Sequence, residues 1–135
     1  MVLKIIIELI CYTSFSIMSI FLNGVVPPSY SNLLFVNGGE YVINSDYKLW
    51  RASSYSVKLI GPQPISMHID SIGWDDNYIV ALQYDIEFGV DDEPDWSKPN
   101  YYIIQLEDDT LIGPLSPEEY EKSQYTYIEL KKINT

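Results

Sequence analysis

Carboxylates gathered in one irregular stretch, residues 85–100, are the side chains best suited to chemistry in this sequence. Asp91, Glu93 and Asp95 alternate there, which is the spacing of the ligands in a calcium-binding loop. The rest of the EF-hand pattern is missing, because Trp96 stands where such a loop needs Gly. We therefore interpret the stretch as an acidic hairpin tip that holds no metal, and we keep an ordered cation site as the alternative.

Trp96 in the same stretch is a candidate anchor for a partner protein, because Trp dominates the binding hot spots of interfaces. The competing interpretation, which we favour, is that its indole folds back to cover an edge of the sheet. The candidate partner-binding residues are this tryptophan and the four carboxylates beside it: Trp96, Asp91, Asp92, Glu93 and Asp95.

No other group of residues has the spacing of a catalytic site. His68 is the single histidine and Cys11 the single cysteine, so no second His or Cys completes a zinc-ligand set, and little material is left for histidine-based catalysis. We expect His68 to lie at the surface or rim of a strand. No serine stands in a Gly-x-Ser-x-Gly elbow, and paired carboxylates in so small a domain do not by themselves predict a glycosidase. The sequence thus predicts a non-enzyme with no catalytic residue and no cofactor.

Acidic residues dominate the sequence and are unevenly placed. The 135 residues carry a formal net charge of −11. Residues 70–121 hold fifteen of the nineteen acidic side chains and one base, Lys98, which gives that segment a charge of −14. Such a surface repels a phosphate backbone, so nucleic acid is excluded as a partner. A solvated acidic face is the simpler interpretation, and attraction of a cation or a basic protein is the other.

The amino terminus predicts export. Lys4 precedes an apolar run over residues 5–22 that Glu8 interrupts, and a helix of that length would span about 27 Å, close to the thickness of a bilayer core. We assign residues 1–23 to a signal peptide or a membrane anchor and favour a retained anchor. Cys11 lacks the preceding small residue of a lipoprotein signal, so we interpret it as an apolar residue of this segment. The protein is expected to be exported, either anchored on the extracytoplasmic side of the membrane or secreted.

The body that must position the candidate residues is rich in β-strands, because its apolar pattern alternates with a period of two. We interpret residues 24–38 as a linker and first strand, and residues 39–135 as a single β-rich domain. Turn residues at 44–46, 75–77 and 107–109 separate expected strands, which are 41–43, 47–51, 55–60, 67–74, 78–85, 101–106, 110–112 and 125–130. The predicted fold class is mainly β, an antiparallel meander of about seven strands that forms a small barrel or sandwich.

One short helix is predicted near residues 117–123. Ser116 is a good N-cap, Pro117 suits the first helical position, and Glu119 stands where it can close a capping box. We interpret this helix as structural.

Four short motifs lie between residues 40 and 130: Trp-Arg-Ala-Ser-Ser at 50–54, Ile-Gly-Trp-Asp at 72–75, Tyr-Tyr-Ile-Ile at 101–104 and Gly-Pro-Leu-Ser at 113–116. Together they resemble a family of small exported bacterial proteins, often lipoproteins, of unknown function. The resemblance implies no activity and no site residues, and the missing lipobox sets this chain apart from the lipoprotein members. Residues 101–121 are also similar to the end of GYF-like modules, which bind proline-rich peptides. We interpret that similarity as local convergence on a strand, a turn and a capped helix.

The sequence therefore predicts a non-enzymatic, exported or membrane-anchored interaction module of unknown specificity that binds a protein partner. One alternative is a small acidic inhibitor or immunity-type protein that blocks a basic partner, and another is a cation-binding structural module. Steep weakening of partner binding with rising ionic strength would favour the blocking protein over the general interaction module.

Overall fold

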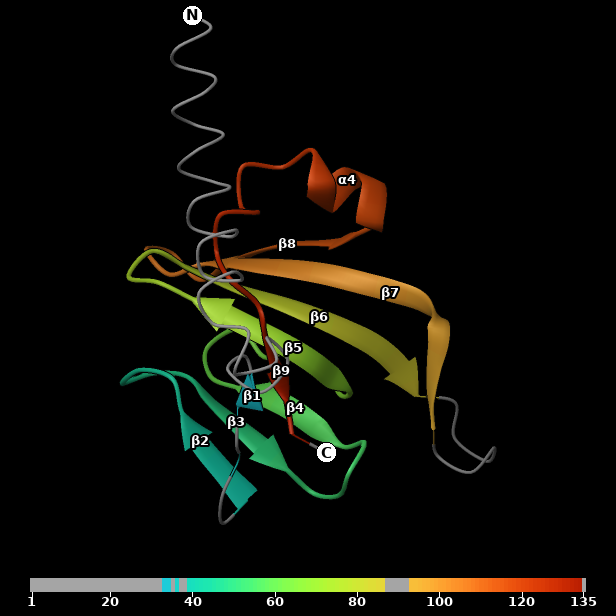
Figure 1. Ribbon diagram of the computed structural model, residues 1–135. Coiled ribbons are helices and arrows are strands. Elements are labelled where there is room, and N and C mark those ends of the chain that lie inside the picture. Colours follow the sequence, from blue (N-terminus) through green and yellow to red (C-terminus); the bar gives the residue numbers. More distant parts are fainter. Residues whose placement is uncertain (1–32, 35, 37–38, 87–92, 135) are drawn as a thin grey trace, which may run out of the picture. The chain divides into compact units, whose positions relative to one another are not determined.

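The computed structural model describes residues 33–34, 36, 39–86 and 93–134 (Figure 1). The predicted export segment, residues 1–23, lies outside this part of the chain. Within the described part, no helix is long and apolar enough to cross a membrane.

The described residues form nine strands and one short helix. In chain order these are β1 (Leu33–Leu34), β2 (Glu40–Val42), β3 (Lys48–Arg51), β4 (Val57–Ile60), β5 (Ile69–Trp74), β6 (Tyr78–Ile86), β7 (Pro94–Gln105), β8 (Thr110–Leu115), α4 (Pro117–Glu121) and β9 (Lys131–Ile133). Strands dominate this part of the chain, so the predicted mainly β class is confirmed.

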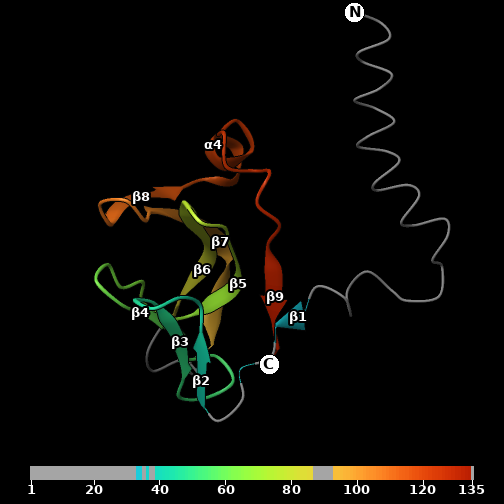
Figure 2. The same cartoon turned by 90° about the vertical axis from the view of Figure 1, so that its left-hand side faces the viewer.

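The strands build two sheets, which Figures 1 and 2 show from two sides. Sheet A has the order β1-β9-β5-β6-β7-β8, and sheet B has the order β2-β3-β4. Strands β5 to β8 form an antiparallel meander, as predicted, and so do β2 to β4. The first strand departs from this pattern, because β1 pairs with β9 in parallel.

The two sheets do not close into a barrel, so of the two predicted architectures the barrel is wrong. Closure would need ladder hydrogen bonds between β8 and sheet B. Pro114 in β8 has no N–H to donate. The edge of β4 is already bridged to another segment, because Leu59 and Ile65 exchange two backbone hydrogen bonds of 2.9 and 3.2 Å. The sheets therefore stay separate and face each other across a core.

A first core cluster fills the space between the sheets. Leu49, Val57 and Leu59 contribute to it from sheet B, and Ile72 and Ile104 contribute from sheet A. All five side chains are fully buried, and burying one aliphatic side chain of this kind stabilises a fold by about 1.5–3 kcal/mol. The alternation predicted for residues 55–60 is confirmed over β4, where every second residue faces this core.

A second core cluster covers the opposite face of sheet A. Val80 and Ile103 of the sheet meet Tyr120 of α4 and two side chains from the segment that follows α4, Tyr125 and Ile128. The middle of sheet A is therefore covered on both faces, by sheet B on one side and by residues 117–130 on the other.

The segment after α4 is not the strand predicted for residues 125–130. Tyr125 and Ile128 are three residues apart and face the same cluster, which a turn permits and the two-residue period of a strand does not. The segment passes so close to β5 that a Cβ on Gly73 would collide with the carbonyl oxygen of Glu129. Close packing on sheet A thus replaces strand pairing here, and β9 begins only at Lys131.

Side-chain to backbone hydrogen bonds hold the three predicted turns. Asn44 and Asp75 each accept two bonds of 2.8 Å from the backbone N–H groups two and three residues further on. Asp108 accepts one bond of 3.1 Å from the N–H two residues on. These local bonds fix the hairpins between β2 and β3, β5 and β6, and β7 and β8.

Helix α4 begins where the sequence predicts. The Ser116 hydroxyl accepts a hydrogen bond of 3.1 Å from the N–H of Glu119, and the Glu119 carboxylate accepts one of 2.9 Å from the N–H of Ser116. This reciprocal pair is the predicted capping box. The helix ends at Glu121 rather than near Ser123, because the backbone N–H and hydroxyl of Ser123 both donate to the carbonyl of Tyr120 and turn the chain.

Ser116→Ala should lower the free energy of unfolding by about 1 kcal/mol, because the N-cap bond is lost. Urea denaturation measures the change. The control is Ser53→Ala, which removes a hydroxyl that donates to Ser56 at the surface, and it should change stability by less than about 0.5 kcal/mol. Equal effects of the two changes would show that Ser116 does not cap the helix in solution.

Candidate functional site

The predicted anchor Trp96 lies near the start of β7, and its side chain is 47% exposed. Its ring meets three other rings edge to face, with centroid distances of 4.9 Å to Tyr84, 5.8 Å to Tyr55 and 6.2 Å to His68. We call these four residues the aromatic cluster. The indole thus packs against other rings on one side and still presents about half of its surface to solvent.

Two of the four carboxylates predicted to accompany Trp96 lie in the described part of the chain. Glu93 is exposed immediately before β7, and Asp95 is partly exposed within it. The hydroxyl and backbone N–H of Ser97 both donate to Asp95, and these bonds lower the pKa of Asp95. Asp95 is therefore ionised at neutral pH. Asp91 and Asp92 lie outside the described residues.

His68 is buried, so the prediction of a surface or rim histidine is wrong. Its backbone N–H and C=O each form a 2.9 Å hydrogen bond with Tyr84 on β6. Its ring lies edge to face with both Tyr55 and Trp96. The two rings that cover it come from the β3–β4 connection and from β7. Both are distant from His68 in the sequence, so the residues around His68 could not predict its burial.

The buried imidazole sits in an unfavourable electrostatic setting. Neither ring nitrogen of His68 has a hydrogen-bond partner among the described residues. Burial lowers the pKa of His68 to about 4; the charge of Asp70 opposes this shift, and the charges of Arg51 and Lys132 add to it. His68 is therefore neutral at pH 7, and protonating it in the folded protein is costly.

Arg51 is a residue of this region that the sequence analysis did not single out. Its Nε and Nη2 atoms are buried and have no acceptor among the described residues. One sequence feature could have found it, because Arg51 lies two residues after the buried Leu49 on β3 and therefore shares its inward face.

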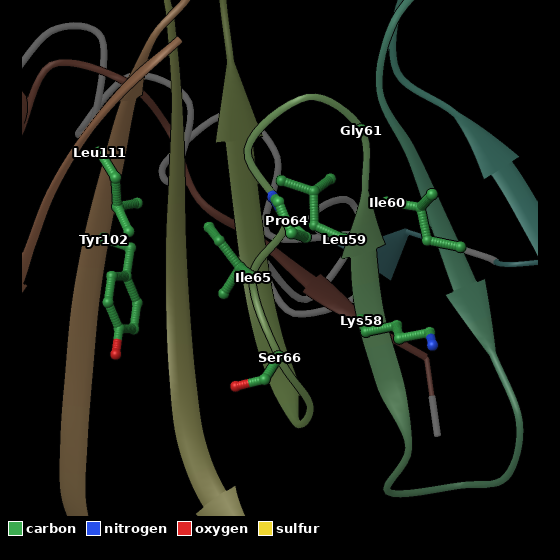
Figure 3. A pocket seen from close by; sticks show the side chains of 9 residues that line it. All are labelled: Lys58, Leu59, Ile60, Gly61, Pro64, Ile65, Ser66, Tyr102 and Leu111. Carbon is green, nitrogen blue, oxygen red and sulfur yellow. The ribbon is translucent and has the colours of Figure 1, made fainter.

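A groove lies between β4 and strands β7 and β8, and its volume is about 710 Å³ (Figure 3). Apolar side chains line most of it: Leu59, Ile65 and Pro64 on one wall, and Tyr102 and Leu111 on the other. It marks the part of sheet A that sheet B does not cover.

A hydrogen-bonded chain joins the two sheets next to this groove. The hydroxyl of Tyr47 on the sheet B side donates to Asp109 at 2.6 Å and accepts a bond of 3.2 Å from the N–H of Gln63. Gln63 lies between the groove residues Gly61 and Pro64. Burial and the bond to Asp109 raise the pKa of Tyr47 to about 12, so its hydroxyl stays protonated and keeps donating at neutral pH.

One end of the groove is polar and centres on the buried side chain of Gln83. Its Nε2 donates to the hydroxyl of Ser66 at 3.3 Å and to the carboxylate of Asp85 at 3.2 Å, and its Oε1 accepts from Asn100 at 2.9 Å. Burial raises the pKa of Tyr102, and the charge of Asp85 raises it further. The hydroxyls of Ser66 and Tyr102 face this end (Figure 3).

The described part of the chain contains no group of three or more His, Cys, Asp or Glu side chains placed to hold a metal ion. The cation site kept as an alternative includes Asp91, which lies outside that part.

Residues 44–133 match a family described as "Protein of unknown function (DUF3997)". The match covers strands β3 to β9, and thus most of both sheets. It agrees with the resemblance to a family of unknown function over residues 40–130. No curated protein and no solved structure matches the chain.

The buried His68 predicts a pH dependence of stability. The unfolded chain takes up a proton near pH 6.5 and the folded protein only near pH 4. Unfolding therefore binds a proton between these values, so the free energy of unfolding should fall as the pH drops from 6.5 to 4, by up to about 3 kcal/mol from this residue. Urea denaturation at pH 4.5, 5.5 and 7 measures the slope.

His68→Phe provides the comparison for this prediction. The variant should lose this part of the slope and be at least as stable as the wild type at pH 7, because two unpaired buried nitrogens are replaced by carbon. The titrating carboxylates contribute equally to the pH dependence of stability in both proteins. Parallel pH profiles would show that the ring is solvated in the folded protein and would contradict the burial.

Proposed function

The chain belongs to the DUF3997 family, whose function is unknown, and we propose from its own residues that it is a non-enzymatic interaction module. It is exported, anchored on the extracytoplasmic side of the membrane or secreted, and it binds a basic protein through Trp96 and the carboxylates beside it. The observation that carries this proposal is the half-exposed indole fixed against three other rings.

The packing of the aromatic cluster makes Trp96 a suitable anchor. Contacts with Tyr55, His68 and Tyr84 restrict the indole before any partner arrives. A side chain that is already ordered loses little conformational entropy on binding, and a large ring with an open face gains much from desolvation. Trp96 therefore has both properties of an interface hot spot.

The charge around Trp96 indicates the partner's chemistry. Glu93 and Asp95 lie within three residues of Trp96 along the chain, and residues 70–121 carry a charge of −14. A field of this sign attracts basic proteins at long range and repels acidic ones and nucleic acids. The acid excess also favours the second candidate function, an inhibitor or immunity-type protein whose acidic face blocks a basic partner.

The export component of the proposal rests on residues 1–23. A reporter enzyme that is active only outside the cytoplasm, fused after Thr135, should be active, because the apolar run would direct the body across the membrane. The control fusion lacks residues 1–22 and should be inactive and soluble. Equal reporter activity in the two fusions would contradict export by this segment.

Trp96→Ala should weaken partner binding more than tenfold, as expected for a hot-spot tryptophan. Partner is recovered by pull-down from an envelope extract at low salt, and the dissociation constant is then measured with the purified partner. The matched control is Trp50→Ala, which removes a 36% exposed tryptophan from sheet B and should leave binding within about twofold. Thermal melts show whether each variant is folded.

Ionic strength separates the two candidate functions. A steep loss of affinity between 50 and 500 mM salt would favour the acidic blocking protein, and a shallow one would favour binding that depends mainly on the indole. Equal affinities of the Trp96→Ala and wild-type proteins would refute Trp96 as the contact.

A further inference from the structure

We propose that the groove between β4 and strands β7 and β8 is the docking site for an extended segment of a partner protein in which an apolar side chain is flanked by Lys or Arg. This is a second surface, distinct from Trp96, and it rests on the proposed function only for the basic character of the partner.

The apolar lining defines what enters the groove. Leu59 and Ile65 are buried, whereas Tyr102 and Leu111 opposite them are only partly buried although they lie on the inner side of a two-sheet structure. The volume of about 710 Å³ lies in the range of about 300–1,000 Å³ that is usual for ligand sites. A partner side chain placed here would cover apolar surface that sheet B leaves open.

Two carboxylates beside the groove favour a basic occupant. Asp109 accepts the Tyr47 bond and lies two residues before the lining residue Leu111. Asp85 accepts a bond from Gln83, and its charge acts on the lining residue Tyr102. The two charges fit an occupant with a base on either side of its apolar residue.

The one cation among the lining residues does not alter this charge pattern. Lys58 points away from the groove in Figure 3, and its Nζ lies 5.1 Å from the centre of the Trp50 ring. A fatty acid or an anionic headgroup would therefore meet carboxylates without a facing cation. A second copy of this chain, with its own charge of −11, would be repelled.

The backbone next to the groove suits an extended occupant. Strand β8 is the last strand of sheet A, so within the described residues one of its edges has no strand partner. Exposed edges of this kind accept an added strand from another chain. Pro114 lacks an N–H, so pairing is confined to the first part of β8, where Leu111 lines the groove.

The test uses a synthetic probe, a capped pentapeptide Lys-Thr-Leu-Thr-Lys, and a matched peptide with Glu in place of both Lys. Each is titrated into the protein, and binding is followed by NMR shifts of the backbone amides. The Lys peptide should shift amides around Leu111, Tyr102 and Ile65, and the Glu peptide should bind at least tenfold more weakly.

Variants assign the binding to the groove. Leu111→Asn should reduce affinity for the Lys peptide at least fivefold, and the adjacent exposed control Thr110→Asn should not. Asp85→Asn keeps an oxygen for the bond to Gln83 and removes the charge, so it should reduce affinity about threefold. Trp96→Ala should leave peptide binding unchanged, which makes failure of this inference distinguishable from failure of the proposed function.

Several outcomes would overturn the inference. These are the absence of shifts at the groove, equal binding of the two peptides, or shifts that map to the aromatic cluster and disappear in Trp96→Ala. Specific binding of decanoate at the groove, or a concentration-dependent dimer that Leu111→Asn abolishes, would show that the groove holds an acyl chain or a second copy instead.

Discussion

The middle of sheet A is buried on both faces, because sheet B packs on one side and residues 117–130 pack on the other. Ile79 and Val80 are neighbours on β6 that point in opposite directions, and both are fully buried, each in a different core cluster. The same double cover explains why β5 needs Gly73, over which the backbone at Glu129 passes in contact. Neither cover can be lost without exposing a row of aliphatic side chains, so the packing of sheet B and that of residues 117–130 depend on each other.

Two polar side chains are buried at the margin of this doubly covered region, and they differ in whether they have hydrogen-bond partners. Gln83 is buried near one end of β6, and its side chain finds acceptors and a donor on Ser66, Asp85 and Asn100. His68 is buried just as fully, and its two ring nitrogens have no hydrogen-bond partner in the described part of the chain. An unpaired buried polar group costs free energy that a satisfied one does not. The unpaired imidazole therefore lowers the stability of the region under Trp96, and the indole that packs on it is also the residue proposed to meet the partner.

Local interactions account for what the sequence could predict, and long-range packing accounts for what it could not. The turn at Asn44 and the capped helix at Ser116 depend on bonds that span two or three residues, so residue types and spacing suffice to find them. Tyr125 and Ile128 looked like a strand because their neighbours are β-formers, yet packing on sheet A decides their conformation. The burial of His68 under Tyr55 and Trp96, and the groove between β4 and strands β7 and β8, both arise from packing of separate segments that no local pattern encodes. The inward position of Arg51, in contrast, could have been inferred from Leu49.

The two surfaces proposed for binding are linked by a single element, the long strand β7. Trp96 lies near its start and Tyr102 lies six residues further on. The pairing of β7 with β6 is irregular between these positions, so at about 3.3 Å per residue they are separated by at most about 20 Å. An interface of ordinary size buries about 800 Å² on each partner, a patch wide enough to include both surfaces. Once one surface is engaged, contact at the second becomes intramolecular and takes place at a high effective concentration. One basic partner that spans β7 would therefore gain more affinity from the pair than from either surface alone, because both surfaces belong to one strand.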